Sequence, residues 1–149
     1  WQGEYPNEQV FLADMARGEC FAVTHGGEVA AVFVLSTLEQ ENYAKITDGK
    51  WTADMAYCVL HRSAVSAKYR GSGMAEFMMK CVERQAAEGF GLRCIRVDTH
   101  RKNKAMQRLL RESGYRYRGN VLIDDAGHDP ARQAYEKILK IKNIAGGCK

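Results

Sequence analysis

The sequence predicts an α/β (α+β) fold with a mixed, mostly antiparallel central sheet, one parallel pair of strands and flanking helices. Residues 20–38 hold two apolar, β-branched runs joined by a Gly-Gly turn at His25–Glu28, which is typical of an antiparallel hairpin. Residues 55–99 read as strand, helix, strand, the connection that parallel neighbours require. With 149 residues, 46% of them hydrophobic, the chain can bury one substantial core. We therefore expect a single domain over residues 1–149.

The N-terminal third of the chain is expected to form a helix, the hairpin and a loop. Apolar residues at helical spacing predict a helix over residues 7–17, and Gly18 follows where such a helix ends. The apolar runs predict strands at residues 20–24 and 29–38. Residues 39–52 are polar without a clear period, so we expect a loop or a poorly formed helix that could close as a lid.

The middle of the chain predicts two strands around a helix. Residues 55–66 form an apolar run that ends in polar groups, and residues 94–99 form a shorter one. The helix between them starts after Gly73 and carries one apolar stripe: Met74, Phe77, Met78, Cys81 and Val82.

The last part of the chain predicts a second helix and two strands. The helix covers residues 102–113 and turns these side chains inward: Ala105, Met106, Leu109 and Leu110. The strands are expected at residues 115–123 and 134–141, joined by the turn-rich segment 124–130.

Composition limits the classes of function. A net charge of +4 with 27% charged residues suits small acidic ligands and falls short of the basic face of a nucleic-acid binder. The five cysteines are scattered without a C-x-x-C pair, so we expect reduced thiols in a cytoplasmic protein and no metal site: Cys20, Cys58, Cys81, Cys94 and Cys148. No apolar run approaches the roughly 20 residues of a membrane span. Neither nucleic acid nor membrane is an expected partner.

The segment Val65–Ala75, VSAKYRGSGMA, is the most informative part of the sequence. An apolar strand ends there, the backbone turns through Gly71 and Gly73, and a helix begins. The first N–H groups of a helix lack intrahelical partners and lie at the positive end of its dipole, and Arg70 lies beside them. The segment therefore predicts an anion site suited to phosphate.

Three glycine-rich patterns compete for this segment. The P-loop pattern G-x-x-x-x-G-K-[ST] is excluded because no Lys-Ser/Thr pair follows the glycines. The dinucleotide-binding pattern G-x-G-x-x-G is disfavoured because Gly71-Ser72-Gly73 lacks the third glycine and follows an antiparallel hairpin. The remaining pattern is Arg-x-x-Gly-x-Ala, formed by Arg70, Gly73 and Ala75.

This pattern resembles the acyl-CoA pyrophosphate loop of the GNAT superfamily of N-acyltransferases. Further segments are similar to that superfamily in the same order: Leu60–Gly73 (LHRSAVSAKYRGSG), Ile95–Thr99, Asn103 and Gly114-Tyr115. Residues 1–6 and 132–137 also resemble an uncharacterised bacterial branch. The resemblance covers nearly the whole chain and implies the acyl-CoA N-acyltransferase fold, with the parallel strand pair at the cofactor site.

The resemblance also implies a binding site for acetyl-CoA. In the family the pyrophosphate lies on backbone amides of the loop, which here belong to Arg70, Gly71, Ser72, Gly73, Met74 and Ala75. The pantetheine arm pairs like an extra strand with the backbone before the loop, here Ala64, Val65 and Ser66. Asn103 corresponds to the family's asparagine that contacts this arm, and helix capping is its alternative role.

Acylation of an amine requires a base, and His61 is the candidate. It lies on the predicted central strand and has a reference pKa of about 6.5, which suits proton transfer near neutrality. Some members of the family that acetylate arylalkylamines carry a histidine at the corresponding place. The alternative is a hydrogen-bonded structural histidine.

The general acid for the thiolate is less clear. The family's usual tyrosine lies seven residues after the asparagine, where this sequence has Leu110. Tyr115, Tyr117 and Tyr135 are possible substitutes, and Tyr135 is the candidate because the resemblance places it near the acceptor side. Packing of a buried aromatic ring is its alternative role, and water can protonate a thiolate without a dedicated residue.

The sequence predicts an acyl-CoA-dependent N-acyltransferase that transfers acetyl directly to a primary amine of a small molecule, amino acid or peptide, as a monomer or homodimer. Direct transfer is favoured because no cysteine has the electropositive setting of a nucleophilic thiolate. The residues that could bind the acceptor are loosely indicated: Tyr5, Tyr43, Trp51 and Glu39–Glu41 for a cationic amine, or Asp98 and Arg132 for an amino-acid-like one. The alternatives are a non-catalytic acyl-CoA-binding sensor and a nucleic-acid-associated regulator.

Overall fold

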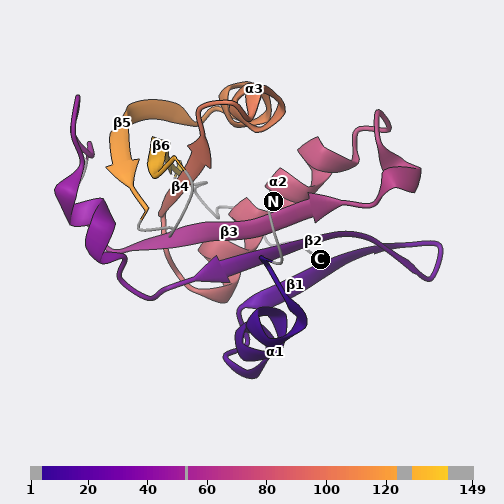
Figure 1. The fold of residues 1–149 in the computed structure, drawn as a ribbon. Helices are drawn as coiled ribbons and strands as arrows, with labels where there is room; N and C mark the ends of the chain where they lie inside the picture. Colours follow the sequence, from indigo (N-terminus) through magenta and orange to yellow (C-terminus); the bar gives the residue numbers. More distant parts are fainter. Residues whose placement is uncertain (1–4, 53, 124–128, 141–149) are drawn as a thin grey trace.

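The computed structural model describes residues 5–52, 54–123 and 129–140, which form one six-stranded sheet with helices packed on it (Figure 1). The strands are β1 (Cys20–His25), β2 (Glu28–Ser36), β3 (Tyr57–Val65), β4 (Cys94–His100), β5 (Arg116–Leu122) and β6 (Ala131–Ile138). The α-helices are α1 (Glu8–Ala16), α2 (Met74–Arg84) and α3 (Lys104–Glu112). The strand order is β1-β2-β3-β4-β6-β5, with β3 and β4 parallel and the other neighbours antiparallel. This is the mixed, mostly antiparallel sheet that the sequence predicts.

Most predicted elements are confirmed to within a few residues. The helix expected over residues 7–17 is α1, and Asn7 is its N-cap, because its Oδ1 accepts a hydrogen bond from the N–H of Val10 at 3.1 Å. β6 begins at Ala131 rather than at residue 134. The end of that predicted strand at residue 141, residues 124–128 of the predicted turn and Cys148 lie outside the described residues. None of the helices in the described ranges is long and apolar enough to cross a membrane.

Each face of the sheet carries its own hydrophobic core. Successive residues of β3 alternate between the two, with Cys58 and Leu60 in one and Val59 in the other. The larger core lies under α2, which runs behind β2 and β3 in Figure 1, and under α3; it includes Met78, Met79, Ile95, Val97, Leu110 and Tyr135. The smaller core, on the opposite face, is built around Tyr43, Val59, Val121 and Ala134.

Two inward positions predicted on the helices are wrong. Phe77 is 53% exposed, and Met79 is buried in its place. The buried stripe of α2 runs through positions 78 and 82, and a step of four residues exceeds one turn, so the stripe drifts toward Met79 and away from Phe77. Ala105 of α3 is also exposed, whereas Gln107 is buried.

Residues 39–52, predicted as a loop or a poorly formed helix, are packed against the sheet more closely than their polar sequence suggests. They contain a 3₁₀ helix, η1 (Glu41–Lys45), whose Tyr43 is 1% exposed. The indole N–H of Trp51 donates to the Tyr43 carbonyl at 2.8 Å, and the two rings lie 5.2 Å apart. Thr47 forms an isolated bridge to Asn120 of β5. Tyr43 and Trp51 are therefore packing residues of the smaller core, and the segment is held against the sheet.

A buried carboxylate ties this segment to the sheet. Glu136 is 1% exposed and accepts hydrogen bonds from the Thr52 N–H at 3.0 Å and from Arg96 Nε at 3.3 Å. The Arg96 guanidinium lies between the rings of Trp51 and Tyr57, 4.4 and 4.0 Å from their centroids. Burial alone raises the pKa of the Glu136 carboxyl, but these donors outweigh it and the pKa is lowered overall.

A second buried carboxylate ties α1 to β3. Asp14 is 0% exposed, and the Arg62 guanidinium donates to it twice, from Nε to Oδ2 and from Nη2 to Oδ1, both at 2.7 Å. Arg17 donates to Oδ1 as well. The apolar periodicity of α1 gives no sign of this ion pair, because its partner lies on a strand far along the sequence.

Replacing Asp14 with alanine should lower the free energy of unfolding by about 3 kcal/mol, because it leaves the largely buried Arg62 guanidinium without its counter-ion. Urea denaturation measures this loss. The matched control is Glu28→Ala, which breaks the exposed pair with Lys68 and should cost less than about 1 kcal/mol. Equal losses for the two variants would contradict a structural role for the Asp14 pair.

Candidate active site

The two parallel strands separate soon after they meet. β3 and β4 pair over only three positions: Tyr57 with Cys94, Cys58 with Ile95 and Val59 with Arg96. Beyond these, β3 continues to Val65 and β4 to His100. The backbone groups that face each other across this split have no ladder partner among the described strands, so the split can accept an extended ligand by backbone pairing.

A β-bulge in β3 lies just past the split point. Arg62 has a φ of 41°, rare for a residue with a side chain, and the pairing of β3 with β2 shifts register between Val32 and Val34. A bulged strand bends locally, and here the bend coincides with the divergence of β3 from β4. The ion pair of Arg62 with Asp14 fixes the side chain of the bulged residue.

The glycine loop follows β3 and starts α2. A short 3₁₀ helix, η2 (Ala67–Tyr69), leads to Gly71 and Gly73, whose φ values are 72° and 83°. The Phe77 N–H donates to the Gly73 carbonyl, so the N–H groups of residues 74–76 are the orphan donors of the helix start. A Cβ at either glycine would meet nothing within 4 Å. The glycines therefore leave open space beside the positive end of α2.

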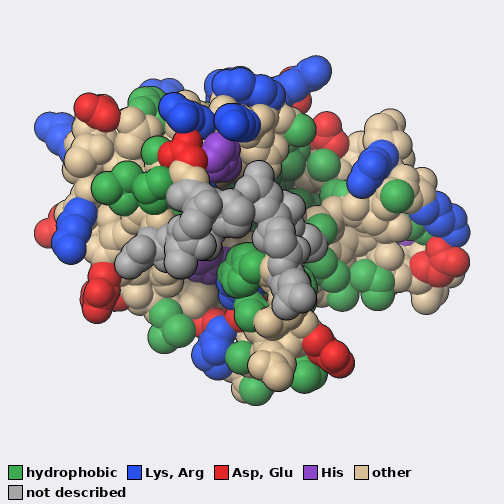
Figure 2. All heavy atoms as spheres, in the orientation of Figure 1, with side chains coloured by type: hydrophobic (Ala, Val, Ile, Leu, Met, Phe, Trp, Pro, Cys, Tyr) green, Lys and Arg blue, Asp and Glu red, His purple; other side chains and the backbone are tan. Residues whose placement is uncertain are grey.

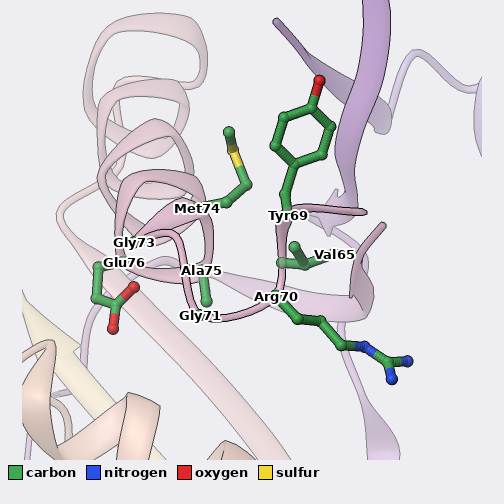
Figure 3. Close-up of a pocket in the computed structure, with 8 residues that line it drawn as sticks. All are labelled: Val65, Tyr69, Arg70, Gly71, Gly73, Met74, Ala75 and Glu76. Atoms are coloured by element: carbon green, nitrogen blue, oxygen red, sulfur yellow. The ribbon is translucent and has the colours of Figure 1, made fainter. Parts of the chain in front are cut away.

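The space beside this loop is a cavity of about 260 Å³ (Figure 3). In Figure 3, Tyr69 and Met74 stand on the same side of the loop, Glu76 lies on the outer side of α2, and Arg70 extends away from the helix. The lining is Val65, Tyr69, Arg70, Gly71, Gly73, Met74, Ala75 and Glu76. Five of the six residues predicted for the pyrophosphate line this cavity, and Ser72 does not. The orphan N–H groups and open glycines fit a pyrophosphate.

The end of β3 bears the residues predicted for the pantetheine arm. Ala64 and Val65 pair with Val32 and Ala31 of β2, and the N–H of Ser66 donates to the Ala30 carbonyl at 2.8 Å. The opposite edge of this segment faces the split, where β4 no longer pairs with it.

Asn103 caps α3, the alternative role considered from the sequence. Its Oδ1 accepts from the N–H of Met106 at 3.1 Å. Exposed Lys and Arg side chains gather over this helix, at the top of Figure 2: Arg101, Lys102, Lys104, Arg108 and Arg111. Such a concentration of positive charge attracts polyanionic ligands.

His61 and Asp98 lie on the two sides of the split. Each is two residues past the last paired position of its strand, Val59 or Arg96, so both fall on the face of the smaller core. Burial lowers the pKa of the His61 imidazole, and the Asp98 carboxylate opposes part of that shift. His61 is therefore neutral near neutral pH and can accept a proton.

His61 is not held as a structural histidine by any residue that the structure describes. Neither of its ring nitrogens has a hydrogen-bond partner there, and neither is fully buried. Asp98, in contrast, is fixed, because its Oδ1 accepts from the Tyr43 hydroxyl at 2.6 Å. The sequence pointed to Asp98 only loosely, since the pairing that places it opposite His61 is visible only in the sheet.

Tyr135 is not brought to the split. Its side chain lies in the larger core, on the opposite face from His61, and β4 lies between β6 and β3. Its ring packs on Tyr117 of β5 at 5.8 Å, and its hydroxyl lies 3.1 Å from Gln133 Oε1. Leu110 is completely buried in the same core. Tyr135 has the packing role that was the alternative for it.

The other residues considered from the sequence are engaged with their own partners or hold protonated thiols. Burial raises the pKa of Cys58 to about 12 and that of Cys94 to about 11, so both thiols stay protonated. Arg132 Nη1 donates to the Asp129 carbonyl at 2.6 Å, and the Tyr5 hydroxyl accepts from Arg62 at 2.8 Å. Within the described ranges, no group of three or more His, Cys, Asp or Glu side chains could hold a metal ion.

A split parallel pair beside a glycine-rich anion site agrees with the acyl-CoA site that the sequence resemblance implies. The sequence profile of the acetyltransferase (GNAT) family matches residues 1–115, and the chain belongs to this family. Its activity is accordingly that of an acetyltransferase. No curated protein matches the chain in sequence.

Solved structures of bacterial proteins share the fold. A GNAT-family acetyltransferase from Streptococcus agalactiae 2603 is 34% identical, with a TM-score of 0.81 over 94% of this chain and 78% of that one. A Bacillus subtilis acetyltransferase in complex with CoA is 17% identical, with a TM-score of 0.64 over 91% and 86%. The Escherichia coli ribosomal-protein-S18-alanine N-acetyltransferase is 14% identical, with a TM-score of 0.66 over 95% and 83%. At 17% and 14% identity, the last two structures show only that the fold is shared.

Gly73→Glu should weaken CoA binding by about a hundredfold or more, equivalent to about 3 kcal/mol, because the side chain crowds and repels the pyrophosphate. Isothermal calorimetry measures this affinity. Gly91→Glu is the matched control: its φ is 65°, a Cβ there also meets nothing within 4 Å, and it lies outside the cavity. Unchanged CoA affinity in Gly73→Glu would refute the assignment of the loop.

Proposed function

We propose that this acetyltransferase uses acetyl-CoA to acetylate a primary amine of a small molecule, amino acid or peptide, by direct transfer in a ternary complex. The observation that carries the proposal is the position of a neutral His61, without a hydrogen-bond partner among the described residues, at the mouth of the split and on the strand that leads to the glycine loop. The buried, protonated thiols of Cys58 and Cys94 support direct transfer over a cysteine intermediate.

The chain offers two sets of backbone groups to the cofactor. The amides of residues 70–75 would hold the pyrophosphate, and the edge of Ala64, Val65 and Ser66 would pair with the pantetheine arm. The amide nitrogen of Asn103 has no partner among the described residues and is available to the same arm. When bound, the cofactor supplies an acetyl thioester.

His61 acts as the general base in this proposal. It accepts a proton from the attacking amine, whose nitrogen forms the new C–N bond as the C–S bond of the thioester breaks. The departing thiolate takes its proton from water. We leave Tyr135 out of the reaction because its ring faces the opposite side of the sheet.

The proposed function is tested by the release of free thiol from acetyl-CoA, measured over a panel of amines, amino acids and peptides. We expect release that depends on the presence of an amine, with the acetylated amine identified by mass spectrometry. Tight CoA binding without amine-dependent release would favour the alternative, an acyl-CoA sensor, for which the replacement of the family's tyrosine by Leu110 is the supporting observation.

His61→Ala should lower kcat by about a hundredfold or more, the range of general-base catalysis, with CoA affinity unchanged. His61 is protonated below its lowered pKa and neutral above it, so kcat/KM of the parent should rise with pH through that value. For His61→Ala, kcat/KM should not show this rise with pH.

Tyr135→Phe is the control for this variant and should keep kcat and the whole pH profile. Identical pH–rate profiles for His61→Ala and the parent would remove His61 from the mechanism. A loss of kcat in Tyr135→Phe would show that the Tyr135 hydroxyl takes part in the mechanism.

A further inference from the structure

The Asp98 carboxylate has no positively charged partner among the described residues. Its Oδ1 accepts from Tyr43, while no described residue donates to Oδ2 or forms an ion pair with Asp98. Oδ2 is not one of the buried, unpaired polar atoms of the described residues, so solvent reaches it from the half-buried side chain. A half-buried carboxylate without a counter-ion is costly unless a ligand supplies one.

The neighbouring carboxylates are compensated in a different way. Asp14 is paired with Arg62, Glu19 with Arg17 and Glu136 with Arg96. The guanidinium of Arg62 also donates to Tyr5. Arg62 and Arg96, which lie on the strands of the split, are thus engaged with other acids, and among the described residues none provides a counter-ion for Asp98.

The proton acceptor His61 lies on the other side of the split. His61 lies across the split from Asp98, and the two side chains share no hydrogen bond, so a group between them can contact both. The charged groups that act on His61 come from several elements: Asp98 on β4, Arg62 on β3, Asp14 on α1 and Glu19 before β1. Of these, Asp98 is the one without a partner of opposite charge in the part of the chain that the structure describes.

We propose that Oδ2 of Asp98 binds the acceptor as an ammonium ion in the split, facing His61, and thereby selects cationic primary amines. The proposal rests on the proposed function for the identity of the ligand as the acetyl acceptor. The charge-assisted hydrogen bond orients the nitrogen, and His61 then removes one of its protons.

Tyr43 is the positioning residue of this site. It is 1% exposed, and burial together with the adjacent Asp98 carboxylate raises its pKa well above the usual value, so its hydroxyl stays protonated and donates at every working pH. The donation occupies Oδ1 and leaves Oδ2 for the ligand. Because Tyr43 also packs on Trp51, the segment 39–52 sets the orientation of the carboxylate.

The first test measures the charge effect of Asp98 without any ligand. The imidazole of His61 is titrated by NMR in the parent, in Asp98→Asn and in Glu88→Gln, with His61→Ala identifying the signal. The amide introduced by Asp98→Asn would keep an oxygen for the Tyr43 hydroxyl, so the fold is retained while the charge is lost. The pKa of His61 should fall in Asp98→Asn and stay unchanged in Glu88→Gln, whose exposed carboxylate lies on the helical face far from the split.

The second test uses n-butylammonium and the neutral n-butanol as probes, titrated into the protein in the presence of CoA. Butylammonium should shift the His61 signal in the parent and in Glu88→Gln, its affinity should fall about ten- to a hundredfold in Asp98→Asn, and butanol should bind both equally weakly. Tyr43→Phe should lower the affinity for butylammonium by an intermediate amount, whereas Tyr135→Phe should leave it unchanged. Binding of butylammonium that is absent, or that is unaffected by Asp98→Asn, overturns the proposal.

The kinetic readout separates this proposal from the proposed function. Asp98→Asn should raise KM for an amine substrate by about ten- to a hundredfold, with the Kd of CoA unchanged. If no amine is acetylated but butylammonium still binds through Asp98, the cation site stands and the proposed transferase reaction fails. If amines are acetylated with the same KM by the variant, the reaction stands and the role of Asp98 fails.

Discussion

The early end of the pairing between β3 and β4 is the constraint on which the site depends. Two parallel strands that pair over three positions and then diverge would ordinarily close to satisfy their backbone groups. Side chains on both strands oppose this. On β3 the bulge at Arg62 is fixed by the buried Asp14 of α1, and on β4 Asp98 is fixed by Tyr43. Both attachments come from outside the sheet, so α1 and the segment 39–52 keep the split open.

The charges around the split match the two ligands of the proposed reaction. At one end, the orphan N–H groups of α2 and the open glycines favour an anion. At the mouth, Asp98 lacks a described counter-ion and favours a cation. His61 lies across the split from Asp98 and is kept neutral by burial, which is the protonation state that a base requires. In the proposed reaction, the anion site would hold the cofactor, and Asp98 and His61 would hold the acceptor.

The sequence predicted the structure of the candidate cofactor loop and much less of the candidate acceptor site, for a physical reason. The glycine loop is a local structure, because positive φ values and orphan N–H groups arise from consecutive residues, and the strand and helix around it follow from their own periodicity. His61 lies on the strand that enters the loop and was found with it. Asp98 lies across from His61 only because of the register of β4, and Tyr43 contacts it from a segment predicted as a surface loop or a poorly formed helix. Contacts between distant segments leave no pattern along the chain, and the same holds for Phe77, whose exposure depends on which stripe of α2 meets the sheet.

The energetic demands of amine acetylation explain why the acceptor half holds the ionisable groups. A lysine-like ammonium has a pKa of about 10.4, so near pH 7 its deprotonation costs about 4 to 5 kcal/mol. A thiol has a pKa of about 8.5, so protonation of a thiolate at the same pH is favourable by about 2 kcal/mol. A dedicated acid is therefore the less necessary partner, which is consistent with a buried Leu110 where the family has a tyrosine. Asp98 imposes a trade-off, since an anion that binds the ammonium also makes it harder to deprotonate. His61 must therefore remove a proton from a less acidic ammonium. The Asp98 carboxylate partly compensates, because it raises the pKa of the His61 imidazole across the split.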